Sequence, residues 1–186
     1  MAKVKAVFLD RDGVLNSHLP ERYVENPDQL VILPGVAAAV KTLNDAGVLV
    51  IVISNQQGVA RGIMTVDDLD GVTNAMKDRL ESEAGATLDS IYYCVHHRAD
   101  GCSCRKPKPG MILDAFAKYN LAPGETAFVG DSATDIEAAG AANVGTKILV
   151  LSGANHYYTR NRFTTQPDYV FATLGEIVRW LLEEDS

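Results

Sequence analysis

The sequence predicts an α/β fold with a doubly wound, mostly parallel sheet. Short apolar runs alternate along the chain with segments whose apolar residues recur at helical spacing, the pattern of parallel strands joined by helices that cover both faces of a sheet. Residues 48–53 are apolar at every position, as expected of a strand buried on both faces. A chain of 186 residues is long for one core and short for two full domains, so we expect a single domain over residues 1–186.

The first half of the chain predicts one β-α-β unit followed by a long helix. Strands are expected at residues 4–9 and 48–53, and the helix between them begins after Pro34 and ends at Gly47, a residue suited to the left-handed end of a helix. Thr65 is the expected N-cap of the next helix, because its hydroxyl accepts a free backbone amide. One buried stripe is predicted for that helix, formed by Val66, Leu69, Val72, Met76 and Leu80.

The second half predicts three further strands, at residues 91–93, 126–129 and 147–151. Helices are expected around Met111 to Tyr119 and around Ile136. Near the carboxyl end, Thr173 and Glu176 form a capping-box pattern ahead of a last helix. Residues 16–33 lack a clear period, and loops of that length are usually functional.

Composition and charge limit the classes of function. Hydrophobic residues make up 47% and charged residues 22% of the chain, which excludes disorder. The net charge of −7 argues against nucleic-acid and anionic-membrane partners, because both require a basic face. No apolar run approaches the roughly 18 residues that span a bilayer, and no secretory signal precedes the first strand. We expect a cytoplasmic protein, and a monomer.

Polar side chains follow the predicted strands where each strand ends. Asp10 to Gly13 follows the first strand, Ser54-Asn55 the second and Gly130-Asp131 a later one, while Arg105-Lys106 precedes a helix. In open α/β sheets, ligands bind beyond the carboxyl ends of the strands. These side chains are therefore expected to converge at one edge of the sheet.

This set of residues suits phosphoryl transfer through an aspartyl phosphate. A carboxylate nucleophile is repelled by an anionic phosphate unless a cation lies between them. Asp10 and Asp131 are candidate Mg²⁺ ligands, Lys106 and Ser54 are candidates to neutralise the transferring group, and Asp12 is a candidate acid and base. Taken singly, each has an ordinary reading as a helix cap, a turn or a solvated surface group. Those readings do not explain why all of them occur at strand ends.

The same residues resemble the four motifs of the haloacid dehalogenase (HAD) superfamily of phosphatases, in family order. The matching segments are residues 7–16, Ser54-Asn55, Lys106 and residues 130–135. The resemblance implies that Asp10 is the nucleophile and Asp12 the general acid and base. It also implies that Mg²⁺ is held by Asp10, the Asp12 backbone carbonyl and Asp131, with Asp135 in a supporting position.

Three cysteines and a histidine cluster within residues 94–104. Cys94, His96, Cys102 and Cys104 provide the Cys₃His ligand set of a closed, structural zinc site. The odd number of cysteines fits a disulfide framework poorly. Two alternatives remain open at this point: buried free thiols beside a surface histidine, or His97 as the ligand in place of His96.

The zinc-binding loop directly before Arg105-Lys106 resembles that of the D,D-heptose 1,7-bisphosphate phosphatase family, which shares it with histidinol-phosphate phosphatases. The resemblance implies a structural zinc ion and a role for Arg105 in recognising a sugar bisphosphate, since a guanidinium suits a second phosphate. Further residues are implied to contact the substrate: His18, Glu21, Ser54, Asn55, Gln56, Gln57 and Lys106.

The expected activity is Mg²⁺-dependent removal of the 7-phosphate from D-glycero-D-manno-heptose 1,7-bisphosphate, a step toward the activated heptose of cell-surface glycans. Histidinol phosphate or another small sugar phosphate is the alternative substrate. Two other classes remain: a receiver-type phospho-acceptor module, although receivers are shorter, and a zinc-dependent binding scaffold without catalysis. The inserts after the first two strands are too short for a large cap domain.

Overall fold

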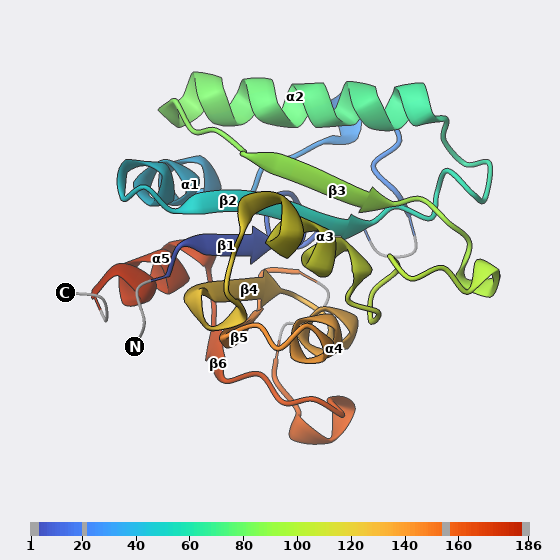
Figure 1. The fold of residues 1–186 in the computed structure, drawn as a ribbon. Helices are drawn as coiled ribbons and strands as arrows, with labels where there is room; N and C mark the ends of the chain where they lie inside the picture. Colours follow the sequence, from blue (N-terminus) through green and yellow to red (C-terminus); the bar gives the residue numbers. More distant parts are fainter. Residues whose placement is uncertain (1–3, 20–21, 154–156, 184–186) are drawn as a thin grey trace.

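A computed structural model describes residues 4–19, 22–153 and 157–183 of the chain. Six parallel strands form one sheet in the order β3-β2-β1-β4-β5-β6, and all of them point toward the same edge (Figure 1). The predicted doubly wound parallel sheet is therefore confirmed. The strands are β1 (Ala6–Leu9), β2 (Leu49–Asn55), β3 (Ser90–Cys94), β4 (Thr126–Gly130), β5 (Thr146–Val150) and β6 (Tyr169–Phe171).

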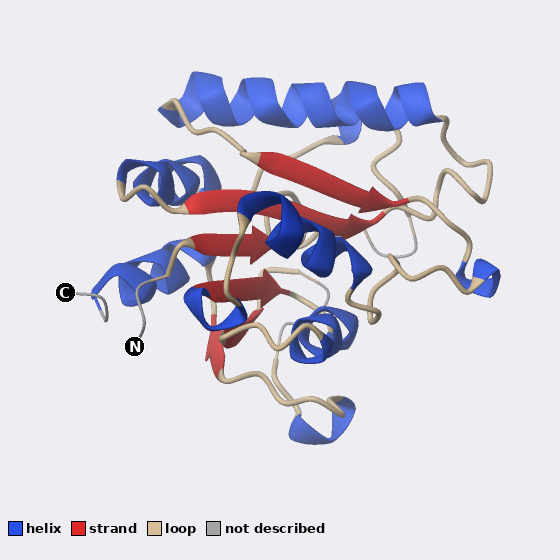
Figure 2. Ribbon diagram, in the orientation of Figure 1, coloured by secondary structure: helices blue, strands red, loops and turns tan. Residues whose placement is uncertain are grey.

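Helices cover both faces of this sheet (Figure 2). One layer contains α1 (Val36–Asp45), α2 (Val66–Ala84) and α5 (Leu174–Glu183), with α1 packed between the other two. The opposite layer contains α3 (Gly110–Tyr119) and α4 (Ala133–Ala141). Successive strand residues alternate between the two cores: Val7 and Leu9 pack with the first layer, and Ala6 and Phe8 with the second.

Helix α2 begins where the sequence places it, but its buried stripe differs by one residue. The Thr65 hydroxyl accepts the Asp68 amide at 3.0 Å, and the Asp68 carboxylate accepts the Thr65 amide at 2.8 Å. The expectation that Val66 is buried is wrong, because its side chain is 54% exposed at the first turn. Thr73 is buried instead.

Strand β6 was not expected from the sequence. It has only three residues at the edge of the sheet, too few for an alternating pattern to be recognised. Its aromatic rings pack on Trp180 of α5, with centroid distances of 4.2 Å to Tyr169 and 5.7 Å to Phe171. The predicted cap of α5 is also modified, because Glu176 accepts the Ala172 amide rather than that of Thr173.

The loop after β1 contains no cap domain within its described residues, as expected. Its longest regular element is the 3-10 helix Pro27–Gln29, and Arg79 of α2 fastens it by donating to the Pro27 carbonyl at 2.9 Å. No helix in the described part of the chain is long and apolar enough to cross a membrane.

Candidate active site

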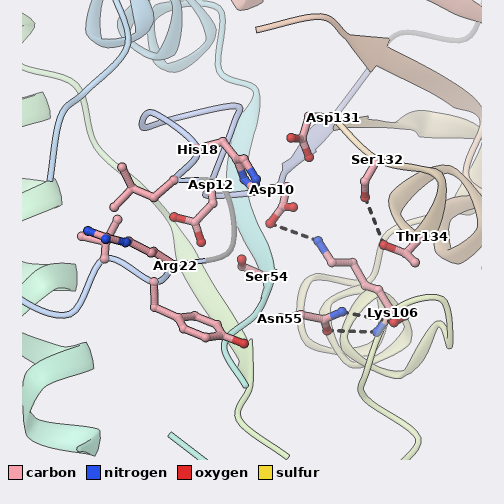
Figure 3. A pocket seen from close by; sticks show the side chains of 13 residues that line it. Asp10, Asp12, His18, Arg22, Ser54, Asn55, Lys106, Asp131, Ser132 and Thr134 are labelled. Carbon is pink, nitrogen blue, oxygen red and sulfur yellow. Dashed lines mark hydrogen bonds and ion pairs between the residues drawn. The ribbon is translucent and has the colours of Figure 1, made fainter. Parts of the chain in front are cut away.

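A pocket of about 200 Å³ opens at the carboxyl ends of the central strands (Figure 3). It brings together side chains from the loop after β1, the last two residues of β2, the start of α4 with the residues just before it, and the segment before α3. The sequence predicts this convergence, although β2 runs two residues further than expected and includes Ser54 and Asn55. Its lining comprises Asp10, Asp12, His18, Leu19, Arg22, Tyr23, Val24, Ser54, Asn55, Lys106, Asp131, Ser132 and Thr134.

Lys106 is a buried cation held between two carboxylates. Its Nζ lies 3.0 Å from Asp10 Oδ1 and 2.6 Å from Asp135 Oδ1, and it donates to the Ile53 carbonyl at 2.8 Å. Burial raises the pKa of Asp10 to about 6, although the Lys106 charge opposes that rise. The two carboxylates more than offset the effect of burial on Lys106 and raise its pKa. This ion pair fixes the ammonium beside the candidate nucleophile.

Both carboxylate oxygens of Asp135 have partners. While its Oδ1 faces Lys106, its Oδ2 accepts the Ser132 amide at 3.0 Å and the Ser132 hydroxyl at 2.6 Å, in a capping box at the start of α4. One carboxylate thus both begins the helix and holds the lysine. The expected supporting role of Asp135 at a Mg²⁺ ion stays a prediction.

Asp131 lies in a space that two glycines keep open. A Cβ added at Gly13 or Gly153 would lie 2.2 or 2.0 Å from Asp131 Oδ2, and Gly13 has a φ of +88°. Carboxylate oxygens of Asp10, Asp131 and Asp135 lie within 4.8 Å of one another. Carboxylate oxygens are ligands that a hard cation such as Mg²⁺ prefers, so this cluster fits such an ion.

Asp12 lies on the other side of the pocket and is surrounded by donors. Arg11 Nη2 lies 3.0 Å from each of its carboxylate oxygens. Asn16 Nδ2 donates to Oδ1 at 2.9 Å, and Gln56 Nε2 donates to Oδ2 at 2.8 Å. Burial alone disfavours the ionised form of Asp12, but the Arg11 charge and the two amides lower its pKa.

The remaining predicted substrate residues are placed in different ways. Ser54 is buried beside Asp10, and His18 is an exposed residue of the pocket lining. Asn55 uses its amide on the main chain of Lys106, donating to its carbonyl at 3.1 Å and accepting its amide at 3.0 Å. Gln56 is fully buried behind Asp12, and the half-buried Gln57 does not line the pocket. Glu21 lies outside the described residues.

A second pocket, of about 320 Å³, adjoins the first and is rich in cationic side chains. It shares three lining residues with the first pocket: Asn55, Lys106 and Thr134. Arg98, Arg105 and Lys108 also line it. Among the described residues, the buried Nη1 of Arg105 finds no hydrogen-bond partner. This pocket therefore has donors available for an anion.

The Cys₃His cluster lies on the segment that forms this second pocket. Five of its six pairs of ligand atoms are 3.0 to 3.7 Å apart, close to the roughly 3.8 Å expected between sulfur ligands around a tetrahedral zinc ion. His96 belongs to the cluster. His97 instead uses its Nδ1 to accept the Ala99 amide. The residues present fit a closed zinc site.

Arg11 and Asn16 are two residues of the site that the sequence does not predict. Arg11 is fully buried, and the amides of Leu15 and Asn16 donate to its carbonyl at 2.9 and 3.1 Å, which folds the loop so that Asn16 reaches Asp12. The available signal was an arginine between two candidate catalytic aspartates, next to a buried strand.

Comparisons with known proteins agree with this geometry. Residues 103–177 match a model of HAD-hydrolase-like proteins. The D-glycero-β-D-manno-heptose-1,7-bisphosphate 7-phosphatase of Haemophilus ducreyi is 41% identical over 155 residues, covering 80% of this chain and 84% of the relative. The enzyme of the same name from Neisseria meningitidis serogroup A is 36% identical, with 98% and 97% covered.

A solved structure is similar over almost the whole fold. The D,D-heptose 1,7-bisphosphate phosphatase of B. bronchiseptica, complexed with magnesium and phosphate, superposes with a TM-score of 0.90 at 34% identity. The superposition covers 97% of this chain and 99% of the other.

Proposed function

We propose that this protein removes the 7-phosphate of D-glycero-D-manno-heptose 1,7-bisphosphate. The chain belongs to the D-glycero-β-D-manno-heptose-1,7-bisphosphate 7-phosphatase family of HAD-like hydrolases. The observation that carries this proposal is the pair of adjoining pockets. One holds the carboxylates and Lys106, and the other is lined by Arg98, Arg105 and Lys108, with Arg105 Nη1 unpaired among the described residues. A bisphosphate places a reacting phosphate in the first and its second phosphate in the other.

The reaction assigned to Asp10 is nucleophilic. An Asp10 carboxylate oxygen bonds to the phosphorus as the bond from phosphorus to the sugar oxygen breaks. The negative charge of the bound phosphate counteracts the lowering of the Asp12 pKa, and Asp12 in its protonated form gives its proton to the sugar oxygen. A water molecule then attacks the aspartyl phosphate while Asp12 takes its proton. Breakage of the bond between phosphorus and the Asp10 oxygen releases inorganic phosphate and restores the Asp10 carboxylate and the protonated Asp12 carboxyl.

Lys106 and Ser54 are assigned to the charge of the transferring group. Lys106 cannot swing away, because its ammonium is already fixed by Asp10, Asp135 and the Ile53 carbonyl. A cation fixed in advance stabilises developing charge without reorganising during the reaction. Asn55 supports this role, because its two contacts hold the Lys106 main chain.

The family implies Mg²⁺ as the catalytic ion, and the residues proposed to hold it are Asp10, Asp131 and the Asp12 backbone carbonyl. When bound, Mg²⁺ supplies positive charge that offsets the repulsion between a carboxylate and a phosphate. Gly13 and Gly153 contribute by leaving room for the Asp131 carboxylate.

A structural zinc ion is proposed at Cys94, His96, Cys102 and Cys104. Four protein ligands leave no position for water, so the proposed role is to shape the segment that presents Arg105. This assignment is supported by the second pocket, which Cys102 and Arg105 both line. Arg105 is proposed to bind the phosphate that is not transferred.

Phosphate release by the purified protein with Mg²⁺ tests the proposal. The substrates are the heptose 1,7-bisphosphate, the heptose 7-phosphate and histidinol phosphate, with Asp10→Asn as the blank. We expect the bisphosphate to react with the highest kcat/KM. A preference for histidinol phosphate keeps the mechanism and rejects the substrate.

Arg105→Met tests the second pocket. This variant is expected to lower kcat/KM for the bisphosphate by about 10-fold or more, the usual cost of an unmade charged contact, and to leave the 7-phosphate nearly unchanged. The matched control is Arg179→Met, on the exposed side of α5, which is expected to change neither. Equal losses on both substrates would contradict the assignment of Arg105.

A further inference from the structure

The carboxylate of Asp12 is held by a cradle of three side chains, Arg11, Asn16 and Gln56. Arg11 Nη2 donates to Oδ1 and Oδ2 at 3.0 Å each, and Arg11 Nε lies 3.3 Å from Oδ1. Asn16 and Gln56 each donate to one of the two oxygens, at 2.9 and 2.8 Å. The carboxylate therefore has donors on both oxygens and one defined orientation.

We infer that Arg11 is a positioning residue for proton transfer: it fixes Asp12 beside the leaving group, with Asn16 and Gln56 completing the cradle. This inference rests on the proposed role of Asp12 as general acid and base. It does not depend on which sugar phosphate is the substrate. None of the three side chains lines the pocket, so they act through Asp12.

Arg11 is buried and Asp12 is partly exposed, as this role requires. The Arg11 side chain is 0% exposed, whereas that of Asp12 is 25% exposed and lines the pocket. The guanidinium thus approaches the carboxylate from the protein side and leaves an open side toward the substrate. A planar fork with two donors to one carboxylate restricts its orientation more than a single ammonium does.

A second layer of contacts restricts Arg11 itself. The guanidinium carbon lies 5.8 Å from the centre of the Tyr93 ring on β3. The Tyr93 hydroxyl is 3.0 Å from the Thr73 hydroxyl of α2. The Thr73 hydroxyl also donates to the Leu69 carbonyl at 2.7 Å. The cradle is therefore anchored on two regular elements rather than on the loop alone, as expected of a preorganised site.

Leaving-group dependence separates positioning from a purely structural ion pair. Alkyl phosphates require a proton on the departing oxygen, whereas p-nitrophenolate leaves without one. A general acid contributes roughly 100- to 10,000-fold. We expect Arg11→Met to lower kcat/KM for alkyl phosphates by about 10- to 100-fold, a part of that contribution. The loss for p-nitrophenyl phosphate is expected to stay below about 3-fold, because this step gains little from acid catalysis.

The experiment measures kcat/KM for both ester types in wild type, Arg11→Met and Gln56→Met. Gln56→Met removes one donor and keeps the charged pair, so it carries the test if Arg11→Met does not fold. It is expected to show the same selectivity with a smaller loss. Equal losses on alkyl and aryl esters, or no loss on either, would overturn the inference.

A double variant tests whether Arg11 acts through Asp12. In the Asp12→Asn background, Arg11→Met is expected to cause no further selective loss on alkyl esters. A further loss of the same size as in wild type would also overturn the inference. If the heptose bisphosphate is not hydrolysed, the best alkyl phosphate replaces it, so failure of the proposed substrate remains distinguishable.

Discussion

Replacing Lys106 with methionine removes the cation that is paired with both Asp10 and Asp135. Methionine matches the length of the lysine stem, so the change is mainly one of charge. Both ion pairs are short, at 3.0 and 2.6 Å, and both partners are almost fully buried. Removing one partner of a buried pair typically costs about 3 to 5 kcal/mol. For a chain of this length, that corresponds to a fall in melting temperature of roughly 6 to 20 °C.

The loss is expected to depend on pH and on Mg²⁺. Burial already raises the pKa of Asp10 to about 6, and Lys106 is the largest influence that lowers it. Without Lys106 the pKa of Asp10 rises further. Asp10 is then protonated at pH 5, whereas at pH 8 its ionisation destabilises the folded state. The difference in melting temperature from wild type should therefore be larger at pH 8. Mg²⁺ should raise the melting temperature of the variant more than that of wild type, because the ion supplies the missing charge.

Thermal unfolding followed by circular dichroism, with EDTA and with Mg²⁺, tests this reasoning. The matched control is Lys41→Met, because Lys41 forms an exposed i,i+4 ion pair with Asp45. Exposed pairs contribute about 0 to 1 kcal/mol, so the control should unfold close to wild type. A Lys106→Met protein that unfolds within about 2 °C of wild type in EDTA at pH 8 would refute the buried-charge argument, since that shift corresponds to less than 1 kcal/mol.

Three further predictions concern the metal sites and one helix. Gly153→Ala places a Cβ 2.0 Å from Oδ2 of Asp131, a proposed Mg²⁺ ligand, and should weaken activation by Mg²⁺ at least about 10-fold. The control Gly124→Ala, where a Cβ meets nothing within 4 Å, should be activated by Mg²⁺ in the same way as wild type. Cys104→Ser should reduce zinc measured by mass spectrometry from about one per chain to a small fraction, whereas Ser103→Ala should retain it. Thr65→Ala removes a helix cap worth about 1 kcal/mol and should lower the melting temperature by about 2 to 4 °C without changing kcat.

The sheet was predictable because burial on both faces leaves a strong pattern. Every position of residues 48–53 is apolar, and in the structure Val50 and Val52 face one core while Ile51 and Ile53 face the other. Strand β6 left no comparable pattern, because Tyr169 and Val170 remain more than a third exposed at the edge of the sheet. Its position depends on pairing with β5, where Tyr169 lies beside Ile148, and on packing against Trp180 of α5, and the three residues of the strand do not encode these contacts by themselves.

The residues that line the pocket were predictable from the sequence, whereas the side chains that hold them in place were not. Asp10 and Asp131 directly follow strands and Ser54 lies near the end of β2, and a parallel sheet brings its strand ends to one edge regardless of side-chain detail. The partners of these groups depend on rotamers and on loop geometry. Gln56 comes directly after β2, yet its side chain turns inward to Asp12, and Arg11 is buried despite its charge. A charged residue at a strand end is therefore ambiguous in sequence. It either faces the ligand or holds a residue that does, and the direction of its side chain decides between the two.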